Sequence, residues 1–207
     1  MQGFLQSRWS KPIVFLLALL PLVLMAASLL RDLGPNPIEY ITHGTGDWTL
    51  RFLLITLAIT PLRRILKQPG LIRFRRMLGI FAFFYACLHL TTWLWLDKFF
   101  DPQEMVADIA KRRFITMGML GFLLLLPLAL TSTAGWIRRL GKNWRRLHRL
   151  IYASALAGVI HYWWLVKSDI RLPLLYGVIL VVLLSLRLVK ARRSAPAEGK
   201  APVEAAY

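Results

Sequence analysis

Residues 80–96 read IFAFFYACLHLTTWLWL, an apolar run without a charged residue that encloses one histidine, His89. A helix needs about 17–25 such residues to cross the hydrocarbon core of a bilayer, so this run is long enough to span it. Lipid cannot satisfy an open strand edge, and the run is therefore expected to be helical. An ionisable ring at membrane depth is costly and points to a functional site. The stretch predicts an all-α membrane protein with a functional histidine inside the bilayer.

The whole chain has the composition of a polytopic membrane protein. Its 207 residues are 57% hydrophobic, with a mean hydropathy of +0.54. The charged residues, 18% of the chain, gather in short blocks between apolar stretches. We therefore expect a six-helix transmembrane bundle. Its spans are predicted at about 12–30, 47–62, 77–96, 114–131, 148–166 and 172–189.

The loops between the expected spans alternate in charge. Loops 63–76 and 132–147 carry arginine and lysine with no acid. Loops 31–46 and 97–113 hold most of the acidic residues. By the positive-inside rule, the two basic loops and both termini lie in the cytoplasm. The formal net charge of +17 then reflects cytoplasmic loops and gives no reason to expect nucleic-acid binding. His43, in the first outer loop, is expected to face solvent.

The chain is expected to form one membrane domain. Residues 1–193 hold the spans, and residues 194–207, rich in Ala, Pro and Glu, are predicted to be a disordered cytoplasmic tail. The polar stretches between the spans are too short to fold a nucleotide-binding unit. Cys87 is the single cysteine, which excludes a disulfide framework and a CxxC metal site.

Two histidines are expected at the same depth in the bilayer. His89 lies seven residues before Leu96, and His161 lies five residues before Val166, at the outer ends of their spans. A rise of about 1.5 Å per residue puts both rings roughly 8–10 Å below those ends. Facing histidines at one level can hold a haem between them. With no carboxylate expected at this depth, a proton relay or zinc site has little support. A histidine–histidine contact between helices remains the alternative.

His148 is expected far from this pair. It lies thirteen residues before His161, or roughly 20 Å along a helix, at the cytoplasmic end. Directly before the span 77–96, Arg75 and Arg76 occupy the level of a partner histidine. A second haem would therefore be held by His148 alone or with a non-histidine partner. His148 could instead touch a flavin or a quinone, or be an ordinary interfacial residue. The two arginines could pair with haem propionates or a flavin phosphate, or simply set the topology.

Three segments of the chain resemble a known family. They are GDWTLRFLLITLAITPLRR (46–64), RFRRMLGIFAFFYACLHLTTWLWLDKFF (73–100) and ITMGMLGFLLLLPLALTSTAGWIRRLGKNWRRLHRLIYASALAGVIHYWWLVKSD (115–169). Together they resemble the haem-binding membrane subunits of the MsrQ (YedZ) family, within the ferric-reductase-like transmembrane group. The resemblance reaches from the first span to the last and leaves out the tail.

The resemblance implies a function in electron transfer. Other members of the wider group have two histidine pairs and a cytosolic dehydrogenase domain. This chain has Arg75 and Arg76 at the level of one missing histidine and shows no flavin or nucleotide domain. Electrons must then come from elsewhere, and the family implies the quinone pool or a flavin reductase. It further implies haem b and FMN as cofactors and the bacterial inner membrane as location. The family's histidines correspond to His89, His148 and His161.

The implied partner is a periplasmic molybdopterin-containing subunit that reduces methionine sulfoxide in proteins, forming a heterodimer with this chain. Catalysis is then expected on the partner, and no catalytic residue is assigned here. Electrons would enter near His148, reach a haem at His89 and His161, and leave to the docked partner. Two alternatives stay open. One is a small transporter or assembly factor whose histidines link helices without haem. The other is a self-sufficient reductase with its own site at the outer face.

Overall fold

The computed structural model describes residues 2–29 and 36–193, and these contain helices and connections but no strand. The predicted disordered tail, 194–207, lies outside the described residues. The all-α prediction is confirmed for the part of the chain that is described. The elements are α1 (Gln2–Gln6), α2 (Ser10–Leu29), α3 (Pro37–Ile65), η1 (Pro69–Phe74), α4 (Arg75–Thr91), η2 (Thr92–Asp97), α5 (Pro102–Lys111), α6 (Arg113–Leu130), α7 (Ala134–Leu140), α8 (Lys142–Leu147), α9 (Leu150–Leu165) and α10 (Arg171–Arg193).

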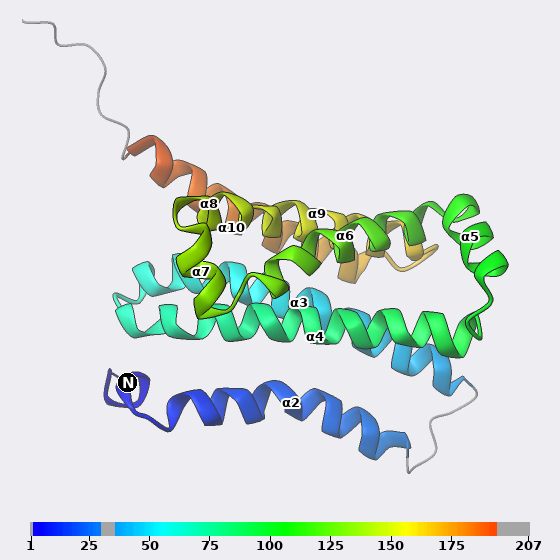
Figure 1. Ribbon diagram of the computed structural model, residues 1–207, viewed down its shortest axis with the longest axis horizontal. Coiled ribbons are helices and arrows are strands. Elements are labelled where there is room, and N and C mark those ends of the chain that lie inside the picture. Colours follow the sequence, from blue (N-terminus) through cyan, green and yellow to red (C-terminus); the bar gives the residue numbers. More distant parts are fainter. Residues whose placement is uncertain (1, 30–35, 194–207) are drawn as a thin grey trace, which may run out of the picture.

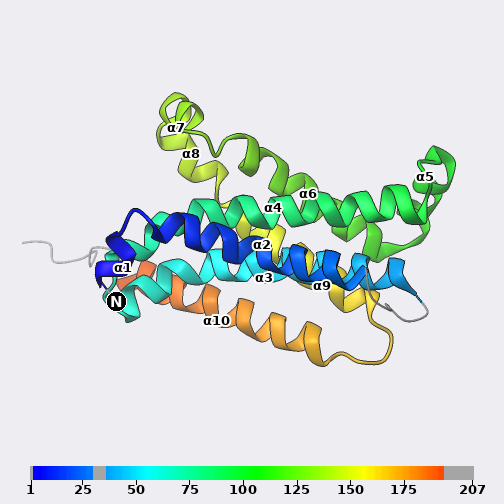
Figure 2. The same cartoon turned by 90° about the horizontal axis from the view of Figure 1, so that it is seen from below.

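The long helices lie side by side along one axis (Figures 1 and 2). The closest pairings are α3 with α4 and α6 with α9, and α10 packs against α3 and α9. The short helix α5 lies at one end of the bundle, which we call the α5 end. The N-terminus, α7 and α8 lie at the opposite end, called the α7–α8 end (Figure 1).

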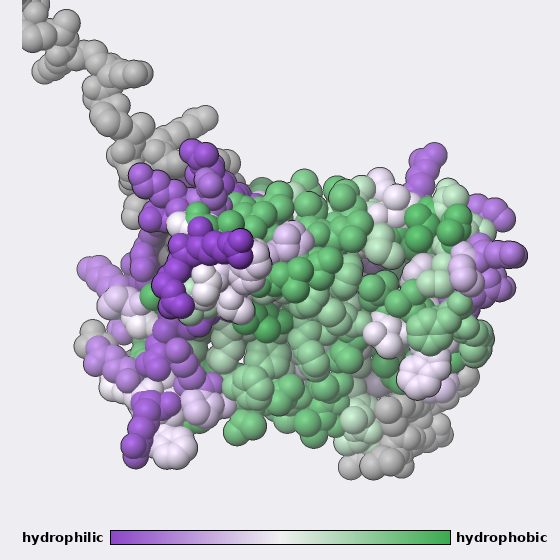
Figure 3. All heavy atoms as spheres, viewed as in Figure 1, coloured by the Kyte–Doolittle hydropathy of each residue, from purple (hydrophilic) through white to green (hydrophobic). Residues whose placement is uncertain are grey.

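The surface has the character of a membrane protein. Figure 3 shows a broad apolar belt between two polar ends, with hydrophilic side chains concentrated at the α7–α8 end. Within the described residues, three helical segments are long and apolar enough to cross a bilayer: Ser10–Ser28, Pro69–Asp97 and Arg113–Leu130. Large apolar side chains such as Leu16 and Val181 are more than half exposed on the outside of the bundle. Such a surface is stable facing lipid rather than water.

Helix α3 begins ten residues before the predicted span, and the expected loop at 37–46 is therefore wrong. The Asn36 side chain accepts a hydrogen bond from the backbone N–H of Glu39 at 3.1 Å, and its amide donates to the Glu39 carboxylate at 2.9 Å. Pro37 occupies the first helical turn, where its missing N–H costs nothing. This N-cap, with its side-chain contact to Glu39, starts the helix in a polar segment. His43 is exposed as expected, but on α3 rather than in a loop.

Helix α2 is attached to α4 by a buried hydroxyl. Tyr85 is fully buried, and its hydroxyl donates to the Ala18 carbonyl at 3.0 Å and accepts from the Leu22 N–H at 3.1 Å. These are the two backbone groups that would pair with each other in an undisturbed helix. The insertion lies next to Pro21, which itself interrupts the helical hydrogen bonds. Tyr85 thus replaces a lost backbone bond and holds α2 in place.

Candidate functional site

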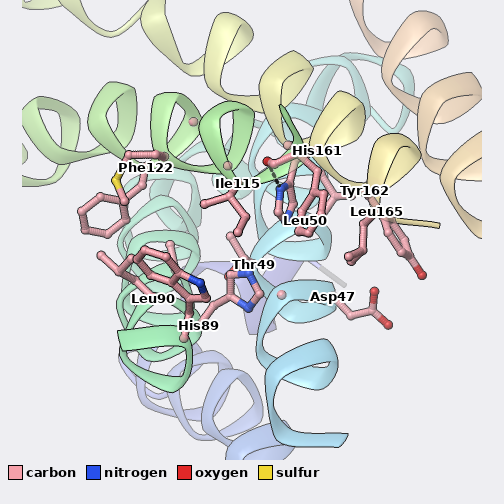
Figure 4. Close-up of a pocket in the computed structure, with 18 of the residues that line it drawn as sticks. Asp47, Thr49, Leu50, His89, Leu90, Ile115, Phe122, His161, Tyr162 and Leu165 are labelled. Atoms are coloured by element: carbon pink, nitrogen blue, oxygen red, sulfur yellow. Dashed lines mark hydrogen bonds between the residues drawn. The ribbon is translucent and has the colours of Figure 1, made fainter. Parts of the chain in front are cut away.

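A cavity of about 210 Å³ lies among α3, α4, α6 and α9, toward the α5 end. His89 and His161 approach each other across it, with Ile115, Leu50 and Leu90 among the side chains around them (Figure 4). The lining is mainly apolar, as expected for a site that takes a hydrophobic ligand and orients it with a few polar groups. The structure therefore brings together the two histidines that the sequence placed at one level.

The two imidazoles are held in the same way by different helices. Their ring centroids are 6.0 Å apart, and the ring planes meet at 76°. His89 Nδ1 lies 2.9 Å from the Thr42 carbonyl oxygen of α3, and His161 Nδ1 lies 2.6 Å from that of Phe114 in α6. A carbonyl only accepts, so Nδ1 must carry the proton in both rings. The lone pair of each Nε2 is then free to bind a metal, the arrangement typical of ligating histidines.

Two glycines make room for these rings. A Cβ on Gly46 would lie 3.0 Å from Cε1 of His89, and a Cβ on Gly118 would lie 2.8 Å from Nδ1 of His161. Contacts this short force a displacement in a packed interior. Gly46 on α3 and Gly118 on α6 thus allow each imidazole to lie directly against the neighbouring backbone. Sequence reasoning had given neither glycine a role.

The helix widens just after His89. Residues 92–97 form the π-helical segment η2, and the Thr92 hydroxyl donates to the His89 carbonyl oxygen at 2.8 Å. Segments of this kind inside α-helices frequently occur at functional sites. Trp93, at the start of η2, therefore lies at the cavity with its indole N–H buried and without a protein partner.

The residues present fit a haem. Metal–imidazole bonds measure about 2 Å, so two imidazoles on opposite sides of one iron have centroids roughly 6 Å apart. The separation of 6.0 Å between His89 and His161 agrees with this value. Among the described residues, no group of three or more His, Cys, Asp or Glu side chains could hold a metal ion alone. Two histidine ligands suit a metal whose other ligands come from a macrocycle.

Two features of the cavity limit how a haem would fit: its small volume and the carboxylate of Asp47 in its lining. The cavity of about 210 Å³ is smaller than common ligand pockets of about 300–1,000 Å³. A porphyrin would therefore extend along the helix interfaces beyond the enclosed space. Asp47 also lines the cavity, so the expectation of no carboxylate at this depth is wrong. The sequence placed Asp47 at the first residue of a span. In the structure α3 begins earlier, at Pro37, and Asp47 lies inside the helix, about one turn after His43.

Asp47 belongs to a polar network beside the cavity. Its carboxylate lies 3.3 Å from the Arg51 guanidinium, whose Nε donates to the Tyr176 hydroxyl of α10 at 2.9 Å. The Tyr162 hydroxyl lies beside Asp47, and its ring packs 6.0 Å from that of Tyr176. The negative charge of Asp47 is thus compensated from α3 itself. The network joins α3, α9 and α10 on one side of the histidine pair.

His148 lies at the α7–α8 end, separate from the cavity. It follows α8 directly, stacks on the Trp144 indole at a centroid distance of 3.9 Å, and its Nδ1 lies 3.1 Å from the Trp144 carbonyl oxygen. Its Nε2 is buried and has no hydrogen-bond partner. The Leu128 backbone also lies near the ring. Neither cavity has His148 in its lining.

The structure separates the two neighbouring arginines. Arg75 lies within electrostatic reach of His148 and of Arg187 on α10. Arg187 donates to the Tyr152 hydroxyl and, at 2.5 Å, to the Leu57 carbonyl oxygen, while its Nε is buried without a partner. Arg76 is exposed and lines a different groove, between α2 and α4. Sequence reasoning had not found Arg187, which lies far away along the chain.

Comparisons with known proteins agree on one family. The family model described as ferric reductase like transmembrane component matches residues 17–159. A Herminiimonas arsenicoxydans protein called protein-methionine-sulfoxide reductase heme-binding subunit MsrQ is 57% identical over 86% of this chain and 83% of its own length. Proteins of the same name from Xanthomonas campestris pv. campestris (strain 8004) and Xanthomonas oryzae pv. oryzae (strain MAFF 311018) are 56% and 57% identical over 79% of each chain. The chain therefore belongs to the ferric-reductase-like transmembrane family, in its group of MsrQ haem-binding subunits.

Proposed function

We propose that this chain is a b-type cytochrome that carries electrons across a membrane, with one haem held by His89 and His161. The observation that carries the proposal is the pair of Nε2 atoms left free by matching Nδ1–carbonyl bonds, on rings 6.0 Å apart in an apolar cavity. The relatives' name, heme-binding subunit, supports the same cofactor. When bound, haem supplies reversible one-electron chemistry. The chain supplies its axial ligands, their orientation and the exclusion of water.

The proposed topology has six spans, with the α7–α8 end in the cytoplasm and the α5 end in the periplasm of a bacterial inner membrane. The accumulation of Arg and Lys around α7, α8 and the 63–76 connection supports this orientation. Residues 1–193 then form one transmembrane haem domain. His89 and His161 lie toward the periplasmic side, where an external acceptor would need the haem edge.

The proposed acceptor is a periplasmic molybdopterin-containing subunit that reduces methionine sulfoxide in proteins and forms a heterodimer with this chain. The relatives are named subunits of a protein-methionine-sulfoxide reductase, which supports this assignment. The proposed donor is the quinone pool or a cytosolic flavin reductase. Catalysis of sulfoxide reduction is assigned to the partner, and the His89–His161 site transfers electrons only.

A second cofactor is proposed at the α7–α8 end, near His148. The free Nε2 of His148 offers one metal ligand, and the nearby Arg75 and Arg187 offer charge for an anionic group. Tyr152 already accepts a hydrogen bond from Arg187, so the cluster is organised rather than mobile. A second haem, or the FMN implied by the family resemblance, would meet this chemistry. Quantification of haem and flavin in the purified protein distinguishes the two.

One alternative has a specific observation in its favour. The Nδ1 contacts of His89 and His161 join α4 to α3 and α9 to α6, so both rings also link helices. A transporter or assembly factor could use them only in this way. Such a protein would be colourless after purification.

The test is the absorption spectrum of the purified full-length protein and of three variants. The wild type is expected to show a Soret band and visible bands of low-spin haem. His89→Ala and His161→Ala should each lose the spectrum of this haem, because each removes one axial ligand. His43→Ala is the matched control, since His43 also borders the cavity but is exposed. A colourless wild type, or an unchanged spectrum in both ligand variants, would contradict the proposal.

A further inference from the structure

A second groove, of about 420 Å³, lies between α2 and α4 and opens on the side of the bundle. One set of its lining side chains is basic and the other is aromatic or aliphatic. The basic side chains come from the beginnings of α2 and α4 and from η1, which directly precedes α4, at the α7–α8 end. They are Lys11, Arg73 and Arg76, and the apolar walls include Phe15, Ile80 and Phe84.

The spacing of these residues along each helix puts the basic side chains at one end of the groove and the apolar side chains along its length. On α2, Lys11 is followed by Phe15 four residues later, and on α4 Arg76 is followed by Ile80 and Phe84 at the same spacing. Residues four apart lie on one face of a helix, and eight residues span about 12 Å. The groove thus has cations at its mouth and an apolar channel about 12 Å long below them. Phe15 packs edge-on against Phe81 at 5.1 Å to form part of the channel wall.

The cations at the mouth have no acidic partner. None of the ion pairs among the described residues includes Lys11, Arg73 or Arg76. Arg73 donates from one nitrogen to the carbonyl oxygens of Leu5 and Ser7, at 2.7 and 3.4 Å, which leaves its other N–H groups free. The sequence has no acid before Asp32 and none between Asp47 and Asp97. Three neighbouring positive charges without a carboxylate favour an anion at this point.

We propose that this groove binds an anionic phospholipid, with its phosphate at Lys11, Arg73 and Arg76 and an acyl chain between α2 and α4. Basic pockets between transmembrane helices are suited to anionic lipid headgroups. A soluble phosphate would make no use of the apolar walls, of which Phe15 is 47% and Ile80 44% exposed. An isoprenoid quinone would fill the channel, but its neutral head would leave three cations uncompensated. An anionic phospholipid matches both parts of the groove, because its phosphate pairs with the cations and its acyl chain covers the apolar walls.

The lipid would also complete the attachment of α2. The α2–α4 interface includes the Tyr85 hydroxyl bonds to Ala18 and Leu22 and the Phe15–Phe81 contact, and this groove interrupts it. A bound acyl chain fills a gap that would otherwise lack van der Waals contacts. The proposal does not depend on haem binding, and the two can fail separately.

The test uses native mass spectrometry of the full-length protein with phosphatidylglycerol and with phosphatidylcholine of the same acyl chains. Phosphatidylglycerol should bind more tightly to the wild type. The double variant Lys11→Gln/Arg76→Gln should weaken it by roughly fivefold for each charge removed. The control is Arg138→Gln/Arg139→Gln, which removes two exposed charges from α7, outside the groove. Equal binding of both lipids, or an equal loss in the control, would overturn the proposal.

A second pair of variants tests the channel with all charges retained. Ile80→Trp should fill the groove and reduce phosphatidylglycerol binding, whereas Leu120→Trp places the same ring at a similarly exposed site on α6. Circular dichroism shows whether each variant is folded. If Ile80→Trp and Leu120→Trp bind the lipid alike, the acyl chain does not lie in this groove. Release of a quinone in place of phospholipid by the wild type would likewise overturn the assignment.

Discussion

The imidazole planes of His89 and His161 meet at 76°, and each ring is oriented by a backbone carbonyl from a different helix. The angle is therefore a property of the helix packing and not of free side-chain rotation. In a histidine that binds a metal through Nε2, a hydrogen bond from Nδ1 fixes the tautomer and the orientation of the ring. A haem bound between these rings would receive two nearly perpendicular axial ligands.

Electron paramagnetic resonance should detect this angle in the oxidised protein. Parallel imidazoles split the two iron d orbitals that overlap with the ring π systems, whereas perpendicular imidazoles leave these orbitals nearly equal in energy. We expect the strongly anisotropic low-spin signal of perpendicular ligation, with the Nδ1 bonds to Thr42 and Phe114 holding the rings. A rhombic signal typical of parallel imidazoles would show that one ring turns when haem binds.

Gly118→Ala should disturb the histidine that it contacts. The new Cβ would lie 2.8 Å from His161 Nδ1, so the ring must move away from its hydrogen bond to Phe114. We expect overpacking to cost about 1–3 kcal/mol and to reduce haem content while altering the visible bands. Gly79→Ala on α4 is the control, because its Cβ would meet only a Thr56 methyl group at 3.6 Å. Normal haem content in Gly118→Ala would mean that the close packing does not matter.

Trp93→Phe should weaken haem retention without changing axial ligation. The substitution keeps an aromatic ring at the cavity and removes the buried N–H that has no protein partner. If this N–H pairs with a haem carboxylate, its loss should lower the apparent haem affinity roughly tenfold. The measurement is haem transfer to a soluble acceptor protein. Trp95→Phe, at an exposed site, should leave the rate unchanged.

His148→Ala should affect the α7–α8 end and spare the haem held by His89 and His161. Its Nε2 is buried and free, and the ring lies outside the cavity that contains the other two histidines. We expect loss of a second cofactor, or reduction by a quinol or a flavin reductase that is at least tenfold slower. The check combines cofactor quantification with stopped-flow reduction. Asn143→Ala, an exposed change on α8, is the control. Unchanged content and rate would contradict a role for His148.

Lys98→Gln should loosen α5 from the end of the bundle. Lys98 Nζ lies 2.7 Å from the Asp108 carboxylate, and the hydrogen bond to this carboxylate raises the pKa of Lys98 above its usual 10.5. A raised pKa in the folded state stabilises it fully below pH 10.5, and this contribution disappears as the pH rises through the folded-state pKa. We expect a loss of about 1 kcal/mol at neutral pH, because Arg112 still compensates Asp108 at 3.3 Å.

Thermal unfolding of wild type and Lys98→Gln across the pH range measures this effect. The difference in melting temperature should be constant from neutral pH to about pH 10 and shrink at higher pH. Lys111→Gln, which changes an exposed residue at the end of α5, should show no such dependence on pH. A difference that grows with pH would have the wrong sign for this ion pair.

The helical, membrane-embedded character of the chain could be predicted from the sequence, because apolar runs of spanning length have few alternatives in lipid. The common level of His89 and His161 was also predictable, since helix rise converts sequence position into depth. The beginning of α3 was not predicted, although Asn36, Pro37 and Glu39 carried a capping signal. Hydropathy alone does not detect a helix that starts in a polar segment, and Asp47 was misplaced for that reason.

The sequence by itself determined the helical, membrane-embedded class of the chain and the common level of His89 and His161. Only the tertiary structure decided which side chains share a site. Arg75 and Arg76 are neighbours in the chain, yet Arg75 lies near His148 and Arg187 while Arg76 lines the groove beside α2. Successive helical residues point about 100° apart, so the rotation and packing of each helix assign them to different partners. The hydrophobicity of a segment constrains its depth in the membrane, but only the packing of the helices determines how each helix is rotated about its axis.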